Sequence, residues 1–439
     1  MMSLFNVLLE MLQSGWLSLL DYVAAHVLLC LVPAFFIAGA MTALIPKEAI
    51  TRYLGKDAPK YISYPAAALG GFVLAVCSCT ILPLFAGIWK KGAGLGPAIT
   101  FLFVGPAVNI LAIAYTGAAI GFDIALARII LSIAFGIIIG LIMAWLFRTK
   151  EETANGALFS QKAAVRPAIW LFFGLLVAIL IAGTLQVGIL TRSYVSIHLP
   201  LDLDGALMSA LDNAHLTVQG AILIVLLLVL APLAYLGLEH IDENINFWTG
   251  IALAAVLVTI LIAAPTVDQT ASVQIDLTGR FFAVTGLTMA AAVVALRGLE
   301  KYEMQEWLWE TWRFVKQIFP LLIVGVFAAG MVKAIIPADW IRTLAGQNTL
   351  WANLIGVVFG VFMYFPTLVE VPIANMFLDL GMHRGPLLAY LLADPELSLQ
   401  SILVTSKILG PKRTWVYVAL VTLFSTLAGY IFGIALTLL

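Results

Sequence analysis

The sequence predicts an all-α polytopic membrane protein with inverted-topology repeats, and three observations lead to this class. The chain has 439 residues, of which 62% are hydrophobic and only 11% are charged, and its mean hydropathy is +1.06. Apolar runs of about twenty residues, the length that spans a bilayer, recur along most of the chain. Glycines and prolines also recur at one fixed spacing between its two ends. This composition lies far outside the range of soluble domains.

Charge and cysteine content exclude several classes of protein. The formal net charge is -1 and no basic tail is present, which argues against a nucleic-acid partner. The three cysteines, Cys30, Cys77 and Cys79, do not make a disulfide framework. The first residues lack a positively charged start and a small-residue cleavage site, so residues 1–18 are expected to form a retained amphipathic lead-in.

Two segments, 19–147 and 310–437, share glycines and prolines at an offset of 289 residues. The matched pairs are Pro83 and Pro372, Gly92 and Gly381, Gly96-Pro97 and Gly385-Pro386, Pro106 and Pro395, and Gly121 and Gly410. Because glycine and proline fix backbone shape, these matches predict a shared backbone path. The region between them, 148–309, is expected to hold four ordinary spans near 168–190, 216–238, 247–265 and 280–297.

The distribution of basic residues predicts the topology. If every apolar run crosses the membrane, the 23 Lys and Arg divide almost evenly between the two sides, against the positive-inside rule. If 65–91 and 353–380 are instead re-entrant hairpins, seventeen fall inside and six outside. The seventeen lie in 47–60, 90–91, 148–166, 297–316 and 407–413. This model has about 10 full spans plus two hairpins, repeats of opposite orientation, and both termini on the extracytoplasmic side.

Inverted repeats with helices broken at mid-membrane are typical of secondary transporters. The prolines are expected to end helices where a substrate site needs exposed backbone, which is tolerated only beside protein or a cavity. Polar and thiol side chains gather at the expected breaks. They are Cys77, Ser78, Cys79 and Thr80 at the first hairpin tip, Asn109 after Pro106, and Thr367 and Glu370 at the second tip.

Three acids lie within apolar segments: Glu370 at the second tip, and Asp394 and Glu396 around Pro395. Charged side chains at membrane depth cost at least a few kcal/mol and usually mark a pathway or a proton relay, so these acids are expected to couple transport to an ion. Asp394 also has a structural alternative, since Asp before Pro-Glu is a good helix-capping sequence. For Asn109 the alternative is a hydrogen bond between packed helices.

The paired cysteines indicate a soft substrate. Thiolates select soft acceptors such as Cu(I), Zn(II) or trivalent arsenic. On an irregular tip Cys77 and Cys79 can face one centre, whereas on a regular helix their spacing would turn them about 200° apart. Two thiolates fall short of a four-ligand zinc site, so they suit a passing cargo better than a structural metal, and no cofactor is expected. The alternative role, a small buried hydrophobe, applies best to Cys30.

The stretch CSCTILPLFAGIWKKGAGLGPAITFLFVGPAVN resembles the signature of the ArsP-like (YraQ-like) predicted permease family, and PTLVEVPIANMFLDLGMHRGPLLAYLLADPELSL resembles its partner motif. The resemblance implies a multi-pass protein of a prokaryotic plasma (inner) membrane. The best-defined members of that family export trivalent organoarsenicals such as methylarsenite, with the paired cysteines implicated in substrate binding, which here are Cys77 and Cys79. Other members are labelled metal-efflux proteins or have no assigned substrate.

The leading interpretation is a proton- or gradient-coupled exporter of a soft thiophilic substrate, first of all trivalent arsenic species, and not an enzyme. One alternative is a permease for a soft metal ion, with Glu370, Asp394 and Glu396 as further ligands. A membrane thiol-disulfide protein fits poorly, because it normally needs a well-spaced pair such as C-x-x-C near an aqueous face. An ATP-driven pump would need a separate nucleotide-binding partner, since the chain has no Walker A sequence.

Overall fold

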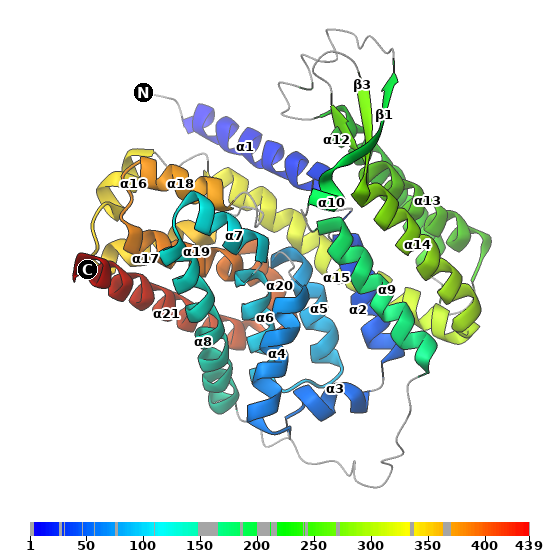
Figure 1. The fold of residues 1–439 in the computed structure, drawn as a ribbon, viewed down its shortest axis with the longest axis horizontal. Coiled ribbons are helices and arrows are strands. Elements are labelled where there is room, and N and C mark those ends of the chain that lie inside the picture. The colour runs from blue at the N-terminus through cyan, green and yellow to red at the C-terminus, as the bar shows by residue number, and fades with distance from the viewer. Residues whose placement is uncertain are drawn as a thin grey trace.

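The computed structural model describes residues 4–25, 29, 31–45, 47–56, 58–74, 78–108, 110–147, 166–184, 188–199, 211, 217–239, 241, 245–268, 273–333, 338–362 and 370–438. Nearly all of this described chain is helical (Figure 1). Six of the described helices are long and apolar enough to cross a membrane: α8 (Phe122–Leu146), α9 (Pro167–Thr184), α12 (Val218–Leu238), α14 (Gly279–Gly298), α15 (Lys301–Lys333) and α21 (Pro411–Leu438). The consecutive helices α19 (Arg384–Leu397) and α20 (Leu399–Leu409), bent by 45°, make a seventh candidate span. This is the architecture of a polytopic membrane protein.

The other expected spans coincide with shorter helices. They are α2 (Val32–Leu44), α13 (Phe247–Ala263), and the pair α6 (Leu95–Ala107) and α7 (Ile110–Ala119). The last two helices meet around Asn109, which lies outside the described residues. The total of about ten spans therefore stays a prediction.

The two expected hairpins fall on pairs of short helices. In the first segment (α2 to α8), α3 (Lys47–Leu54) leads into the arms α4 (Lys60–Leu74) and α5 (Ser78–Lys90), and both arms pack against α6. In the second segment (α15 to α21), α16 (Ala338–Ala345) leads into α17 (Leu350–Phe362) and α18 (Glu370–Asp379), and both pack against α19. The tips, 75–77 and 363–369, lie outside the described residues.

The two ends of each pair of arms lie side by side. The backbone N–H of Gly94, after the first pair, donates to the carbonyl oxygen of Leu54, before it, over 2.7 Å. In the second segment the N–H of His383 donates in the same way to the carbonyl of Ala345 over 2.9 Å. In both segments the chain therefore returns to the place where the first arm began.

The offset of 289 that relates glycines and prolines also relates helix boundaries. Helices α6, α7 and α8 begin at residues 95, 110 and 122, and α19, α20 and α21 begin at 384, 399 and 411. Gly92 and Gly381 have φ of 85° and 94°, and Gly121 and Gly410 have φ of 145° and 86°. Positive φ is costly for residues with a Cβ atom, so glycine permits the turn at these matched places.

Matched glycines also let helices cross closely. A Cβ atom on Gly140 of α8 would lie 2.7 Å from the carbonyl oxygen of Gly96 on α6. One on Gly429 of α21 would lie 2.5 Å from the carbonyl oxygen of Gly385 on α19. The closeness of each crossing therefore depends on the missing side chain.

The region between the segments contains helices and a small sheet. Helix α9 packs against α14 and α2, and α12 packs against α13, which starts with a capping box formed by Asn246 and Thr249. Strands β1 (Ser193–Leu199), β2 (Thr266–Asp268) and β3 (Val273–Thr278) form an antiparallel sheet in the order β1-β3-β2. The all-α expectation is wrong here, because the search for apolar runs passed over short strands of alternating polarity between the spans.

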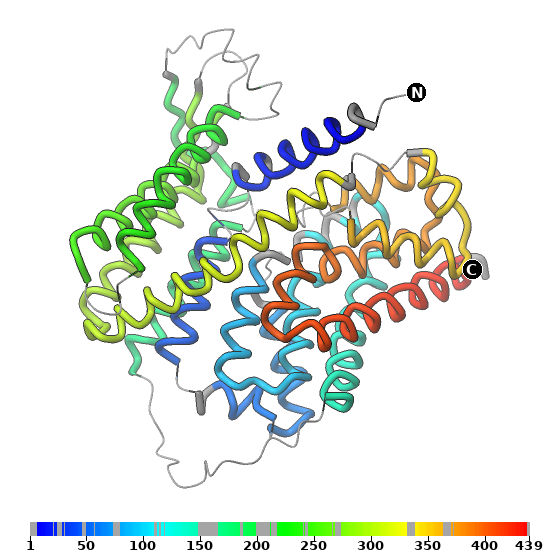
Figure 2. The backbone as a smooth tube through the Cα atoms, turned by 180° about the vertical axis from the view of Figure 1, so that it is seen from behind, coloured from blue at the N-terminus to red at the C-terminus, as the bar shows by residue number. Residues whose placement is uncertain are grey.

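The long helix α15 crosses the molecule and carries the N-terminal helix on one flank (Figure 2). Helix α1 (Leu4–Ala25) continues past residue 18, where the lead-in was expected to end, and packs against α15. The Ser14 hydroxyl donates to the carbonyl oxygen of Gly330 over 2.8 Å. The short helix α10 (Gly188–Thr191) precedes β1.

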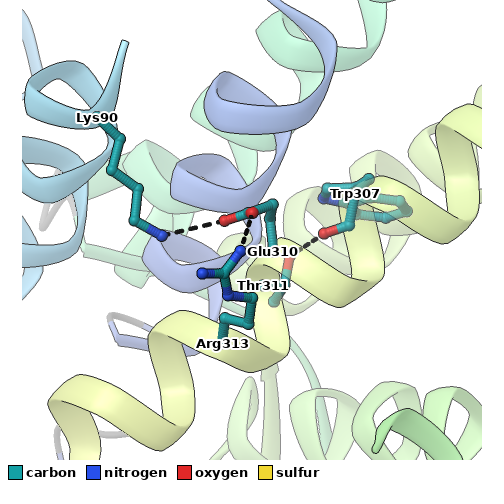
Figure 3. Close-up of polar contacts among 5 residues, drawn as sticks. All are labelled: Lys90, Trp307, Glu310, Thr311 and Arg313. Atoms are coloured by element: carbon teal, nitrogen blue, oxygen red, sulfur yellow. Dashed lines mark hydrogen bonds and ion pairs between the residues drawn. The ribbon is translucent and has the colours of Figure 1, made fainter. Parts of the chain in front are cut away.

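An ion pair joins the end of α5 to α15, next to a second pair within α15 (Figure 3). Lys90 Nζ lies 3.1 Å from Glu310 Oε2, and Arg313 Nη1 lies 2.8 Å from Glu310 Oε1. The guanidinium of Arg413 lies over the ring of Trp89, 5.7 Å from its centroid. Three basic residues assigned by the charge distribution to the inner face are thus grouped around the end of α5.

The first prediction concerns sidedness. Single cysteines at Lys56 and Lys90 are expected to react with an impermeant maleimide from the same side of the membrane, and a cysteine at Arg384 from the opposite side. The reason is that residues 54–56 lie beside residues 93–94, at the two ends of the first pair of arms. The protein without added cysteines and permeabilised cells provide the blank and the full-labelling controls. Labelling of positions 56 and 90 from opposite sides would contradict the hairpin topology.

Candidate functional site

A buried ion pair links the two segments. Arg128 Nη2, on α8 of the first segment, lies 2.9 Å from Glu370 Oε2, at the start of α18 in the second segment. Both side chains are 0% exposed. Arg128 Nε also donates to the carbonyl oxygen of Ala107, near the end of α6, over 3.1 Å. The pair therefore joins α6, α8 and α18 at a single point.

Two further acids lie where α19 ends and the chain bends into α20. Asp394 and Glu396 are 1% and 4% exposed. The phenol of Tyr417, on α21, donates to Glu396 Oε2 over 2.6 Å. Helix α17 approaches this place closely, because a Cβ atom on Gly360 would lie 3.0 Å from the backbone nitrogen of Asp394.

These groups form one electrostatic cluster. Asp394 interacts with the charges of both Glu370 and Arg128, and Glu396 interacts with that of Arg128. Tyr390, fully buried on α19, interacts electrostatically with Asp394, Glu370 and Arg128. We call these residues the polar cluster: Arg128, Glu370, Tyr390, Asp394, Glu396 and Tyr417.

The polar cluster has unused hydrogen-bonding capacity. Among the described residues, one buried polar atom in each of five members has no hydrogen-bond partner: Arg128 Nη1, Glu370 Oε1, Tyr390 Oη, Asp394 Oδ1 and Glu396 Oε1. Buried polar groups are nearly always paired in folded proteins, and exceptions often have a functional explanation. Burying a charge in apolar surroundings also costs several kcal/mol unless it is well compensated. The arrangement is therefore suited to bind and release a proton or a polar group.

The cluster lies deep within the helices that carry it. Asp394 is ten residues from the start of α19 at Arg384, which is about 15 Å at 1.5 Å per residue. Glu370 is nine residues from the end of α18 at Asp379, or about 14 Å. These depths are about half of a hydrocarbon layer of roughly 30 Å.

The shallow end of α19 is fixed by its own polar contacts. Arg384 Nη2 lies 3.0 Å from Asp123 Oδ1 and donates to the carbonyl of Ile120 over 3.2 Å. His383 Nδ1 accepts from the N–H of Gly385 over 3.1 Å. Partial burial, with a smaller contribution from Arg384, lowers the pKa of His383, which favours the neutral ring that this cap requires.

The predicted substrate residues are described only in part. Cys77, Asn109 and Thr367 lie outside the described residues, as does Cys30. For Ser78 and Cys79 only the backbone is described, at the start of α5, and Thr80 is buried on the same helix. The structure therefore leaves their grouping at the hairpin tips as a prediction.

The prolines and glycines of the predicted backbone breaks occupy different places in their helices. Pro106 and Pro395 lie one and two residues before the ends of α6 and α19. Pro372 lies in the first turn of α18, where proline is tolerated. Pro83 does not end α5. A proline lacks the N–H that would donate to the carbonyl four residues earlier, and for Pro83 that carbonyl lies in the first turn of the helix. The pairs Gly96-Pro97 and Gly385-Pro386 lie in the first turns of α6 and α19.

The acids do not form a metal-ligand set. Within the described part of the chain, no three His, Cys, Asp or Glu side chains come together in a way that could hold a metal ion. The soft-metal alternative placed these acids beside Cys77 and Cys79, whose side chains lie outside the described part of the structure, so that grouping stays a prediction. The described partners of the acids are Arg128 and Tyr417.

Arg128 is the residue that sequence reasoning missed. The charge distribution counted it on the outer side, but the structure buries it completely in α8. A signal was present, because Arg128 is the only Lys or Arg between Lys91 and Arg148, within an apolar run. A lone charge in such a run is a functional candidate by default. Its partner could not be read from the sequence, because Glu370 is 242 positions away.

Comparisons place the chain among permeases of unassigned substrate. A family model described as a predicted permease matches residues 13–434. The UPF0718 protein MJ0584 of Methanocaldococcus jannaschii is 36% identical over 440 residues, covering 99% of this chain and 97% of the relative. The UPF0718 proteins YcgR of Bacillus subtilis and YraQ of Escherichia coli are 25% and 21% identical, over 26% and 42% of this chain and 39% and 55% of their own lengths. No solved structure matches the chain.

The second prediction tests the hydrogen bond within the polar cluster. Tyr417→Phe removes the described donor to the buried Glu396, and an unpaired buried acceptor costs about 1–3 kcal/mol. We expect a lower thermal midpoint for the detergent-solubilised variant. Tyr430→Phe, a partly exposed tyrosine on the same helix, is the matched control and is expected to change little. Equal midpoints for both variants would show that the bond does not stabilise the protein.

Proposed function

Because the chain belongs to the ArsP-like family of predicted permeases, we propose that it is a secondary-active permease that exports a soft, thiophilic substrate. The observation that carries the proposal is the fully buried Arg128–Glu370 pair, close to Asp394 and Glu396 where α19 bends. Buried charges beside a broken helix at mid-membrane are the usual components of an ion-coupled transport site.

We further propose that the two segments are inverted-topology repeats. The shared offset of helix starts and of positive-φ glycines supports a common backbone path. The contacts between the ends of each pair of arms support re-entrant hairpins. Cross-packing of α5 on α20 and of α18 on α7 brings the second arm of each hairpin against the other segment. In this arrangement both termini are extracytoplasmic and the protein lies in a prokaryotic inner membrane.

The proposed substrate site lies between the two hairpin tips. Cys77 and Cys79 would bind a soft centre through their thiolates, since soft ligands select soft acceptors. Trivalent organoarsenicals are the first proposed substrate, on the strength of the family resemblance and the thiol pair. The polar residues expected to complete the site are Ser78, Thr80, Asn109, Thr367 and Glu370. A soft metal ion such as Cu(I) or Zn(II) is the alternative substrate, because the same thiol pair would also select it.

Uphill export needs a coupled ion when the substrate carries no charge. The membrane potential does not drive a neutral As(III) species. Its export against a concentration gradient must therefore be driven by the gradient of a coupled ion. Glu370, Asp394 and Glu396 are the proposed proton carriers, because they are buried acids with unpaired oxygens among the described residues. Such acids in transporters commonly form proton relays.

The third prediction concerns the thiols. Cys77→Ser or Cys79→Ser is expected to abolish resistance to methylarsenite in a sensitised cell without loss of protein from the membrane, because a hydroxyl is a poor ligand for a soft centre. Cys30→Ser is the control and is expected to be nearly silent. Full resistance in both serine variants would mean that the substrate is not bound by these thiols.

The fourth prediction concerns coupling. Glu370→Gln removes an acid but keeps a hydrogen-bond acceptor, so it is expected to stop concentrative transport while substrate binding persists. Proton flux and substrate flux are measured together in proteoliposomes. Asp276→Asn, at a partly exposed acid of β3 outside the polar cluster, is the control and should transport normally. Asp394→Asn is less informative, because asparagine can also cap a helix. Normal uphill transport by Glu370→Gln would exclude coupling through this acid.

A further inference from the structure

We propose that Arg128 is the internal positioning cation of the permease: it holds Glu370 as a carboxylate until a proton arrives, and then turns to Asp394. This inference rests on the proposed function, because it assigns the step by which the proton changes the site. It concerns a residue on the first segment that acts through acids on the second.

The geometry of the pair suits an exchange of partners. Arg128 Nη2 and Glu370 Oε2 make a single contact of 2.9 Å, while Arg128 Nη1 and Glu370 Oε1 have no hydrogen-bond partner among the described residues. A pair that served only to stabilise the fold would gain most from two parallel hydrogen bonds and full satisfaction of both groups. Arg128 is held at Nε by the carbonyl of Ala107, so the guanidinium has a fixed point about which its other two nitrogens can reorient.

The alternative partner is already present. Asp394 interacts electrostatically with both members of the pair, and its Oδ1 has no hydrogen-bond partner within the described chain. One guanidinium, which stays protonated in proteins, interacts electrostatically with the three acids Glu370, Asp394 and Glu396. It cannot neutralise all three at once. Arg128 therefore pairs with whichever acid carries the charge, while protons occupy the others.

The step conserves charge and atoms. At the start, Glu370 is the carboxylate paired with Arg128 and Asp394 carries a proton. A proton from one side of the membrane binds Glu370, the proton of Asp394 leaves towards the other side, and the guanidinium pairs with the Asp394 carboxylate. Transfer of the Glu370 proton to Asp394 forms the original pair again, so each cycle makes and breaks one O–H bond on each acid and moves one proton across.

Other charged groups do not supply this cation. The described side chains that face Glu370 and Arg128 come from α8, α18, α19 and α21, and the titratable or charged ones are the members of the polar cluster. Helix α6 contributes no titratable side chain, and the buried Tyr64 of α4 lies against Gly96 at the far end of α6. In the described part of the cluster, Arg128 is the sole positive group.

The test uses three variants in proteoliposomes: Arg128→Gln, Arg128→Lys, and the double variant Arg128→Gln with Glu370→Gln. Methylarsenite exchange, which needs no net driving force, is measured across a range of pH, together with proton flux. In Arg128→Gln, exchange is expected to fall about tenfold at high pH, where Glu370 is left as an uncompensated anion, and to recover at low pH, where Glu370 is protonated. The double variant is expected to exchange at all pH values without proton flux.

Arg128→Lys keeps a positive charge, but on a shorter side chain with a compact ammonium group. Coupling is therefore expected to persist, with a shifted pH profile of exchange. The proposal is overturned if Arg128→Gln and Arg128→Lys both keep the wild-type pH profile, or if the double variant still moves protons with substrate. Membrane abundance and size-exclusion profiles show whether each variant folds. If Arg128→Gln does not fold, the double variant, which buries no unpaired charge at this pair, is used to test the proposal. Failure of the proposed function gives a different result, because the wild type itself would then show no methylarsenite exchange in proteoliposomes.

Discussion

The ion pair between Arg128 and Glu370 is the interaction on which the rest of the structure depends. Two charges without exposure are tolerated only where each has a partner, so α8 and α18 must be held together from opposite ends of the sequence. The close crossing of α8 on α6, permitted by Gly140, positions the arginine, and the carbonyl of Ala107 anchors it. The packing of α6 against α8 therefore helps to bring the guanidinium to the carboxylate.

Positions of the two segments that are related by the offset of 289 carry different side chains. At the offset of 289, both Arg128 and Tyr417 reach from the last helix of their segment towards the end of the broken helix. In the first segment that end offers only a backbone carbonyl, and in the second it offers a carboxylate. The remaining equivalences are Ile81 with Glu370, Gly105 with Asp394, and Ala107 with Glu396. The three buried acids of the polar cluster therefore all come from the second segment, at positions where the first segment has uncharged residues.

Hydrophobic run length predicted the positions of helices between the two segments, since α14 covers Gly279–Gly298 where 280–297 was expected. The offset of 289 found from glycines and prolines also relates the starts of α6, α7 and α8 to those of α19, α20 and α21, because these residues constrain the backbone locally. Reasoning from runs missed the strand β1, whose polarity alternates, and the continuation of α5 through Pro83. It also missed Arg128, because burial by a distant partner is a tertiary property that no local pattern contains.

The position of Arg128 provides a physical connection between substrate binding and proton binding at the proposed site. The proposed thiol ligands, Cys77 and Cys79, belong to the predicted hairpin of the first segment, and Arg128 lies on α8 of that segment, joined to α6. A substrate that shifts α6 against α18 changes the distance between the guanidinium and Glu370, and with it the affinity of Glu370 for a proton. By linkage, protonation of Glu370 must change substrate affinity by the same factor. Coupling then requires no direct contact between substrate and acid, only a cation attached to one segment and paired with the other.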